Sequence, residues 1–362
     1  MLRFGALLNS KNQEKTKFEI EECYPKPLFS KLPTSKKWNK WVAYLDKYLL
    51  FPKKINQKLQ GSSKPIDLVH IIDHSNSVYL PQFKEISKAK KIITCHDLIA
   101  IRTAYGEFPS APKTSKSGKR LQKWIHNSLE YADYYACDSK QTKQDLTQLI
   151  PGSELNSAII HLGTETNFLT TKKQRPSLDK LPFNPSKTKY LLHVGSAAWY
   201  KNRQAIYKAF RHASEKLPNL NLKLILVGPK PQNEELDVGL SDWLQSHPNS
   251  LICLNNLSEN SLAELYKYSK ALVFPSFIEG FGWPPLEAAV RGCPVITTRT
   301  GAISDLLGNY AKYVEAENQA SIDQGVMQAL QLTRSRQGAI ALPSHEDCRR
   351  QYFDLYEQVM AN

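Results

Sequence analysis

The sequence predicts an α/β protein made of two doubly wound domains. At 362 residues the chain exceeds the size at which a single hydrophobic core keeps growing. Short apolar runs that end in glycine alternate with stretches of helical periodicity, which is typical of parallel sheets covered by helices. Hydrophobic residues make up 41% of the chain and charged residues 23%, as in folded, soluble proteins.

The clearest alternation of strands and helices lies in the C-terminal half. Residues 189–195 and 222–228 are apolar runs ending in glycine, and we expect them to be buried parallel strands. Between them, residues 202–217 place apolar side chains on one helical face, so the three segments form a βαβ unit. The pattern continues with strands at 251–254, 271–275 and 294–297 and helices at 261–268 and 285–291. Ligands of such a domain bind beyond the carboxyl ends of the strands.

The N-terminal half shows a weaker version of the same pattern. We expect strands near 2–8 and at 67–72, 91–95, 134–137 and 157–161, with a helix at 117–132. Residues 170–187 are rich in Lys, Pro, Ser and Thr and lack periodicity, which is typical of an interdomain linker. The predicted division is therefore an N-terminal domain at 1–170, a linker at 171–188, a C-terminal domain at 189–343 and a final helix at 344–362.

The net charge of +14 lies entirely in the N-terminal half. Residues 1–188 contain 31 Lys and Arg against 17 Asp and Glu, whereas residues 189–362 contain 17 of each class. This asymmetry indicates that the N-terminal half meets an anionic partner. Six cysteines without a C-x-x-C pair favour reduced thiols and a cytoplasmic location. The sequence contains no run of about 18 apolar residues that would predict a membrane span.

The segment most specific for function is 274–289, with the sequence FPSFIEGFGWPPLEAA. A buried strand leads into a loop in which Gly280 and Gly282 allow a ligand to approach the backbone. A proline pair then begins a helix whose N-terminal amides suit an anionic group such as a diphosphate. Glu279 and Glu287 lie on either side of this turn and can reach different parts of one extended ligand. For either carboxylate alone, stabilisation of the helix start is a structural alternative.

This segment resembles the E-x7-E motif of retaining glycosyltransferase family 4, whose members have the GT-B architecture. The resemblance continues at 95–99 (CHDLI), 129–139 (LEYADYYACDS), 161–165 (HLGTE) and 193–202 (HVGSAAWYKN). It implies an α/β GT-B fold, in which two Rossmann-like domains face each other across a cleft. It also implies a hexosyltransferase that uses a nucleotide-diphosphate sugar, with UDP or GDP as the nucleotide.

The resemblance further implies roles for individual residues. Lys201 would neutralise the donor diphosphate, Glu279 would lie near the donor sugar hydroxyls, and Glu287 would accept hydrogen bonds from the ribose. The implied catalytic set is His96, Lys201 and Glu279. The implied donor-binding set is Gly195, Ser196, Lys201, Asn256, Leu257, Ser276, Glu279, Gly280, Phe281, Gly282 and Glu287, and the acceptor-side candidates are His74, Asn76 and Asp97. A solvated Lys201 and a purely structural His96 or His74 are the alternatives.

Two features depart from the family pattern. Family members usually carry an Arg near the position of Ser196, so Arg203 or a cation of the N-terminal domain would have to complete the diphosphate clamp. The glycine-rich loop that many members have after the first N-terminal strand is missing at residues 8–12. The resemblance implies transfer without a divalent metal, and the sequence offers no dense His, Cys and Asp cluster with convincing ligand spacing.

The basic N-terminal half allows two interpretations. Residues 38–59 predict a helix up to Pro52 that carries one large apolar face, formed by Trp38, Trp41, Leu45, Tyr48 and Leu49. With its lysines, such a helix suits an anionic membrane surface, and a core-facing helix with solvated lysines is the alternative. We expect a saccharide or lipid-linked acceptor and a location in the cytoplasm, with the inner face of a membrane as a contact surface. Nucleic acid is disfavoured because no recognition motif is present.

Two further functions fit the same architecture. A sugar-nucleotide epimerase needs acid and base groups around the sugar but no acceptor, and a non-catalytic nucleotide-sugar-binding protein would bind donor without turnover. Release of free nucleotide distinguishes transfer from both. Residues 344–360 have apolar side chains at helical spacing, and the resemblance implies that this helix crosses back to the N-terminal domain. A helix packed on its own domain is the alternative.

Overall fold

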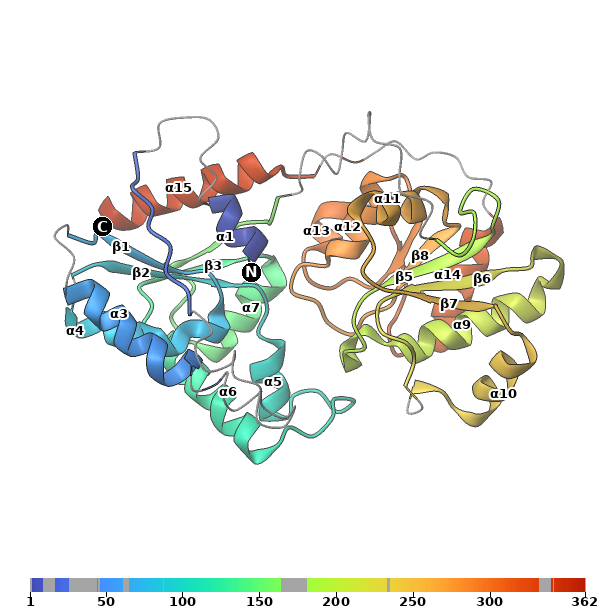
Figure 1. The fold of residues 1–362 in the computed structure, drawn as a ribbon, viewed down its shortest axis with the longest axis horizontal. Coiled ribbons are helices and arrows are strands. Elements are labelled where there is room, and N and C mark those ends of the chain that lie inside the picture. Colours follow the sequence, from blue (N-terminus) through green and yellow to red (C-terminus); the bar gives the residue numbers. More distant parts are fainter. Residues whose placement is uncertain are drawn as a thin grey trace.

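The computed structural model describes residues 2–8, 17–25, 44, 46–60, 65–86, 88–163, 181–232, 235–331, 340 and 342–361. Within this part of the chain, the strands form two parallel sheets, each in its own α/β domain (Figure 1). The α/β fold class predicted from the sequence is confirmed. Most of the predicted linker lies outside the described residues.

The N-terminal sheet has four strands in chain order, β1-β2-β3-β4. These are β1 (Leu68–Ile71), β2 (Lys90–Cys95), β3 (Tyr134–Cys137) and β4 (Ser157–Ile159). The helices around them are α1 (Leu2–Leu8), α3 (Phe51–Gln60), α4 (Leu80–Ile86), α5 (Ile99–Tyr105), α6 (Lys116–Leu129) and α7 (Lys140–Leu149), with shorter turns at Asp46–Leu50 and His74–Tyr79. Side chains of α3, α4, α6 and the strands share one buried apolar cluster.

The C-terminal sheet has six strands in the order β10-β9-β8-β5-β6-β7. These are β5 (Tyr190–Val194), β6 (Lys223–Val227), β7 (Leu251–Leu254), β8 (Ala271–Phe274), β9 (Val295–Thr297) and β10 (Lys312–Tyr313). The helices are α9 (Arg203–Lys216), α10 (Val238–Ser246), α11 (Glu259–Tyr268), α12 (Trp283–Val290), α13 (Ile303–Leu307) and α14 (Gln319–Gln331), with one-turn helices at Trp199–Lys201 and Pro218–Leu220. Continuous apolar runs form these strands because both faces of the sheet are covered.

The order of the C-terminal strands reverses between β5 and β8. From β5 the chain moves outward through β6 and β7, and then returns to place β8 on the other side of β5. The loops after β5 and β8 therefore diverge from neighbouring strand ends, which opens a crevice at this point of an α/β sheet. The fold itself thus predicts where a ligand binds.

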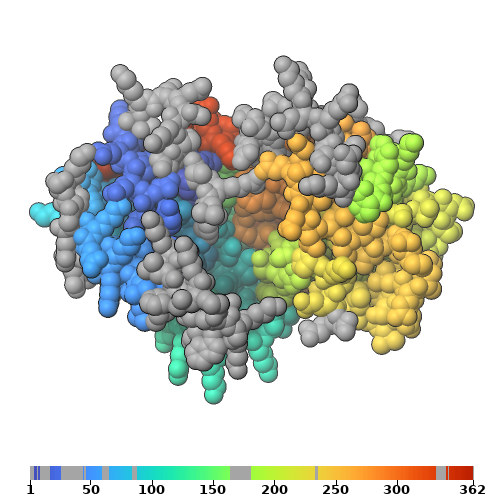
Figure 2. All heavy atoms as spheres, in the orientation of Figure 1, coloured from blue at the N-terminus to red at the C-terminus, as the bar shows by residue number. Residues whose placement is uncertain are grey.

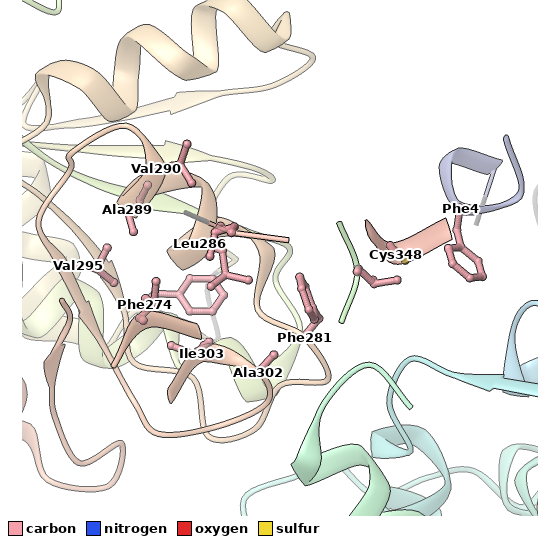
Figure 3. Close-up of a cluster of buried hydrophobic side chains, with 14 of the residues drawn as sticks. Phe4, Phe274, Phe281, Leu286, Ala289, Val290, Val295, Ala302, Ile303 and Cys348 are labelled. Atoms are coloured by element: carbon pink, nitrogen blue, oxygen red, sulfur yellow. The ribbon is translucent and has the colours of Figure 1, made fainter. Parts of the chain in front are cut away.

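The helix α12 is held by a dense apolar cluster below this crevice. Figure 3 shows Phe274, Leu286, Val295 and Ile303 gathered around it. In the same view Phe281 projects from this cluster toward Cys348. The cluster fixes the backbone that precedes α12, and so positions the 275–282 loop.

The final helix, α15 (His345–Ala361), lies on the N-terminal sheet and not on its own domain (Figure 1). Tyr356 and Tyr352 hydrogen-bond to His70 of β1 (2.7 Å) and Thr94 of β2 (2.9 Å), respectively. Phe4 of α1 packs edge-on against the Tyr352 ring at 5.2 Å. The last residues of the chain therefore complete the core of its first domain.

Two local predictions are wrong. Residues 2–8 form a helix and not a strand, because Phe4 and Leu8, one helical turn apart, are both buried beside α15. The predicted helix stop at Pro52 is also wrong, since proline is tolerated in the first turn of a helix and Pro52 is the second residue of α3.

The proposed apolar face at 38–59 is divided in the structure. Tyr48 packs against Trp124 of α6 with ring centroids 5.5 Å apart, whereas Leu49 is 58% exposed. Trp38, Trp41 and Leu45 lie outside the described residues. Among the helices that the structure describes, none combines the length and the apolar composition needed to cross a bilayer.

Candidate active site

Lys201 and Glu279 meet at the point where the strand order reverses. Lys201 ends the one-turn helix that follows β5, and Glu279 lies in the loop that follows β8. The Lys201 Nζ lies 2.8 Å from Glu279 Oε1 and 3.0 Å from Oε2. Two predicted site residues separated by 78 positions thus form one ion pair.

This ion pair is largely shielded from solvent. The side chains of Lys201 and Glu279 are 12% and 7% exposed, and the Nζ also lies 4.8 Å from the centre of the Phe274 ring. Burial raises the pKa of Glu279, while the Lys201 ammonium opposes that rise. Either charge alone would be costly to bury, so the two side chains stabilise each other at this position.

The loop that carries Glu279 is fixed by hydrogen bonds and by a close approach to the other domain. The backbone N–H of Glu279 donates to Thr300 Oγ1 at 2.9 Å. A Cβ at Gly280 would collide with the backbone carbonyl of His96, which belongs to the N-terminal domain. Gly282 has a φ of 92° and precedes α12. The two glycines that the sequence singled out therefore have different roles, one at the domain contact and one at the helix start.

The N-terminus of α12 offers fewer backbone N–H donors to an anion than the sequence led us to expect. The first residues of this helix are Trp283, Pro284 and Pro285, and the two prolines have no N–H to donate. The backbone donors that face an anion at this end are therefore confined to the loop from Gly280 to Trp283. Phe281 from this loop is buried, with its ring 4.9 Å from Trp283 and 6.3 Å from His161 of the N-terminal half.

Glu287 is not part of the Lys201 ion pair. It lies on α12 and accepts a hydrogen bond from the Tyr266 hydroxyl of α11 at 3.0 Å. Burial, followed by the Glu287 carboxylate, raises the pKa of Tyr266 well above its ordinary value. The two carboxylates of the motif thus have different partners, Lys201 for Glu279 and Tyr266 for Glu287.

His96 has no ring nitrogen left for a sugar in this conformation. Its Nδ1 donates to Asp138 Oδ2 at 2.6 Å and its Nε2 donates to the Ile72 carbonyl at 2.9 Å. Burial alone lowers the pKa of His96, but the Asp138 carboxylate outweighs it and the net pKa is raised to about 9. With acceptors at both nitrogens, the ring is a cation that joins three strand ends of the N-terminal domain.

The acceptor-side candidates lie together at the ends of β1 and β2. His74 is buried, with its Nδ1 3.5 Å from Asp73 Oδ1, and its pKa is lowered, chiefly by burial. Asn76 follows on the same turn, and its N–H donates to the Asp73 carbonyl. Asp97 accepts a hydrogen bond from the N–H of Ile99 at 3.1 Å. Burial raises the pKa of Tyr200 to about 12, with smaller contributions from Glu279 and Asp97. Of these residues, Asp97 faces the ion pair from the opposite domain, because its charge acts on both Glu279 and Tyr200.

The remaining predicted donor-binding residues follow β5, β7 and β8 of the C-terminal sheet. Ser196, after β5, is exposed and accepts from the N–H of Ala198 at 3.4 Å, next to Gly195. Asn256, after β7, is exposed with a φ of 53°, and Leu257 is half-buried. Ser276 is fully buried after β8.

Arg203 cannot replace the missing arginine near Ser196, contrary to one expectation. It is 4% exposed, and its guanidinium donates to the Tyr207 hydroxyl at 2.6 Å and the Pro229 carbonyl at 2.9 Å. Glu235 lies 3.3 Å from its Nε. The guanidinium is therefore committed to the C-terminal core.

Sequence reasoning did not identify Asp138, Thr300 and Tyr200. Asp138 holds His96, Thr300 holds the Glu279 backbone, and Tyr200 borders the ion pair. Asp138 follows a buried strand and was detectable by that pattern alone. Thr300 had no such signal, because its partner is distant in the chain. Tyr200 lies next to Lys201 in the 193–202 motif, but nothing in that motif set it apart. Among the described residues, no group of three or more His, Cys, Asp or Glu could hold a metal ion.

Residues 174–341 match the family model of the glycosyl transferases group 1. This range covers nearly all of the C-terminal domain, which is therefore similar to the glycosyl transferases group 1. The predicted family resemblance is confirmed at this level, and the matched range contains Lys201, Glu279 and Glu287.

Curated relatives of this chain include several mannosyltransferases. The chain is 27% identical over 245 residues to the serotype-specific mannosyltransferase WbdA of Escherichia coli, which covers 64% of this chain and 28% of WbdA. It is 23% identical over 316 residues to the O-antigen chain mannosyltransferase B of Escherichia coli, covering 80% of this chain and 75% of the relative. The chain thus spans little more than a quarter of the length of WbdA.

Solved structures similar to this chain have the GT-B fold. The α,α-trehalose 6-phosphate synthase of Burkholderia multivorans has a TM-score of 0.64 at 13% identity, covering 92% of this chain and 79% of that one. The sucrose-phosphate synthase of Thermosynechococcus elongatus has a TM-score of 0.63 at 18% identity, covering 86% and 77%. The GT-B architecture predicted from the resemblance is confirmed.

Proposed function

We propose that the chain is a retaining hexosyltransferase that moves a sugar from a nucleotide diphosphate to a saccharide or lipid-linked acceptor. The observation that carries this proposal is the buried Lys201–Glu279 pair at the strand reversal of the group 1 domain. The names of the mannosyltransferase relatives favour mannose as the transferred sugar and a polysaccharide chain as the acceptor.

In this proposal the donor diphosphate takes over Lys201 from Glu279. The ammonium then stabilises the charge that develops on the leaving diphosphate, together with the amides from Gly280 to Trp283. Glu279, released from Lys201, accepts hydrogen bonds from hydroxyls of the donor sugar. Glu287 accepts hydrogen bonds from the ribose. Because Lys201 supplies the positive charge, we propose that transfer proceeds without a divalent metal.

The N-terminal domain has a supporting part in this mechanism. The His96 cation, fixed by Asp138, places a positive charge at the end of β2 beside the Gly280 loop. We therefore assign it to the electrostatics of the closed cleft. This charge supports the leaving group where the usual arginine near Ser196 is missing.

The test is a turnover assay with GDP-mannose and UDP-glucose in the presence of EDTA. We expect nucleotide release that depends on a mannoside acceptor, and a product whose anomeric configuration, read by proton NMR, equals that of the donor. Glu279→Ala should abolish transfer, and Glu287→Ala should mainly raise the donor KM. Sugar conversion without nucleotide release would instead identify an epimerase, and donor binding without any turnover would identify a non-catalytic protein.

We also propose that the protein works in the cytoplasm at an anionic membrane surface. The excess of 14 positive charges in residues 1–188 supports this location, because lipid-linked acceptors lie at such surfaces. Co-sedimentation with phosphatidylserine vesicles, absent with phosphatidylcholine vesicles, would support it. Equal recovery in both supernatants would contradict it.

A further inference from the structure

A cavity opens at the boundary of the two domains, next to the loops that carry the ion pair. Its volume is about 440 Å³. Phe108, from the loop between α5 and α6, forms the wall on the N-terminal domain, and Trp199 and Phe277 form the facing wall. Figure 2 shows teal atoms of the N-terminal domain touching yellow-green atoms of the C-terminal domain near the centre of the molecule.

The aromatic rings of this cavity form a platform. The Trp199 and Phe277 rings are inclined by only 23°, with centroids 6.1 Å apart, and Phe108 lies 5.3 Å from Trp199. Each of the three side chains is only partly buried. Flat, partly exposed aromatic faces beside polar groups are typical of ligand pockets.

The polar groups of the cavity come from the loop after β10. Glu315, Glu317 and Asn318 are exposed at its rim, and the Asn318 amide lies 3.4 Å from Glu315 Oε2. Carboxylate and amide oxygens accept hydrogen bonds from hydroxyl groups. Arg102 lies over the Phe108 ring at 4.9 Å, but its guanidinium is paired with Glu107 at 2.6 Å and Asp145 at 2.7 Å and offers the cavity no free positive charge. The aromatic faces and the hydroxyl-accepting rim suit a polyol with an apolar face.

The C-terminal wall of the cavity is pre-formed by hydrogen bonds among three loops. The Asn202 amide donates to the Pro275 carbonyl at 3.1 Å and the Ala316 carbonyl at 2.8 Å. The Phe277 N–H donates to the Tyr200 carbonyl at 2.8 Å. The loops that carry the aromatic platform and the acidic rim therefore hold one fixed relation to each other.

The same loops carry the ion pair. Trp199 precedes Lys201 by two residues, and Phe277 precedes Glu279 by two residues. A ligand held on the aromatic platform would therefore sit next to the position at which the donor sugar reacts. This adjacency points to the acceptor and not to a remote regulatory ligand.

We propose that this cavity binds a pyranose unit of the acceptor saccharide. The apolar face of the sugar ring stacks on Trp199 and Phe277, and its hydroxyls donate to Glu315 and Glu317. This inference rests on the proposed transferase function and assigns the acceptor site of that function. It also gives the contact between Phe108 and Trp199 a purpose, because closing the domains encloses the acceptor.

The experiment measures binding of methyl α-D-mannopyranoside by saturation-transfer NMR in the presence of GDP or UDP, with the glucoside and galactoside as further probes. We expect Trp199→Ala to weaken binding of the preferred sugar by about tenfold, and Trp199→Phe to restore most of it. Glu317→Gln should weaken binding less. Trp124→Ala, which removes another partly exposed tryptophan on α6, is the matched control and should leave binding unchanged.

Steady-state kinetics separate this inference from the proposed function. If both hold, Trp199→Ala raises the acceptor KM by about tenfold while the donor KM changes less than about twofold. If turnover is intact but neither Trp199→Ala nor Glu317→Gln changes the acceptor KM or sugar binding, the acceptor site lies elsewhere and the inference is wrong. If the wild type lacks turnover yet binds the sugar through Trp199, the proposed function is wrong and the cavity is a saccharide site of a binding protein.

Discussion

At the scale of single residues, the site consists of two buried charge pairs, one in each domain. Lys201 with Glu279 and His96 with Asp138 lie on opposite sides of the Gly280 contact. Removing one partner from a buried pair leaves an uncompensated charge, whereas removing both charges avoids that cost. This difference allows the structural and chemical roles of each pair to be separated.

Lys201→Ala should lower the free energy of unfolding, by about 3 kcal/mol, because it leaves the Glu279 carboxylate buried without a partner. The double variant Lys201→Met with Glu279→Gln should regain most of that loss but bind no donor. Urea unfolding monitored by circular dichroism measures both. A double variant as unstable as Lys201→Ala would show that the loss has another source.

His96 should make stability depend on pH. Its folded pKa of about 9 lies above the ordinary value near 6.5, so its stabilising contribution is complete below about pH 6.5 and is lost as pH rises through 9. We expect His96→Gln to flatten this decline in the free energy of unfolding. Asp138→Asn should flatten it as well, because it removes the carboxylate that raises the pKa. Parallel pH profiles for wild type and both variants would contradict this assignment.

Gly280→Ala should hold the two domains apart, because a Cβ at this position would collide with the His96 carbonyl. We expect a larger radius of gyration by small-angle X-ray scattering and a rate of transfer reduced by at least about tenfold. Gly239→Ala on α10 is the control, since its Cβ would only touch the end of the Arg211 side chain at 3.4 Å. Unchanged scattering and activity for Gly280→Ala would mean that the contact yields easily.

At the scale of secondary structure elements, α15 is the clearest link between the domains. Its tyrosines reach into the N-terminal sheet, where Tyr352 and His70 share the Thr94 hydroxyl. His70 is neutral under ordinary conditions because burial lowers its pKa to about 3. The helix therefore joins the N-terminal core by uncharged hydrogen bonds and aromatic packing.

Tyr356→Phe should lower the free energy of unfolding by about 1–3 kcal/mol, because it leaves a buried His70 nitrogen without its partner. The donor KM should be unchanged, since Tyr356 is remote from the C-terminal crevice in the chain and packs on the other domain. Phe353→Leu, on the same helix, tests whether packing alone explains the loss. Wild-type stability of Tyr356→Phe would indicate that water replaces the hydroxyl.

Apart from β10, which lies in no predicted range, the strands were predictable because buried parallel strands are continuous apolar runs, and the structure places them within a few residues of the expected ranges. The helix at residues 2–8 was not predictable, because its seven residues are compatible with a strand or a helix. The outcome depends on packing against α15, more than 300 residues away. Local patterns cannot report such a distant partner.

At the scale of the whole molecule, the sequence predicted that Lys201 and Glu279 belong to one site, but not how the facing residues are held. Lys201 and Glu279 stand out because family motifs and strand ends mark them. The role of Arg203 depends on Glu235, whose position no spacing rule predicts. The role of His96 depends on Asp138, which only its place after a buried strand marked. The aromatic cavity joins residues from both domains, and so it becomes visible only when the domains are placed together.

The proposed mechanism requires that a nucleotide-sugar donor breaks the Lys201–Glu279 ion pair, with its diphosphate on Lys201 and its sugar on Glu279. A thermal-shift panel of UDP, GDP and ADP sugars with EDTA, on wild type and Lys201→Ala, tests it most directly. Because a ligand that binds only the folded state raises its stability, one nucleotide class should raise the Tm of the wild type and not that of the variant. An equal rise in both proteins, or no rise with any donor, would contradict the claim.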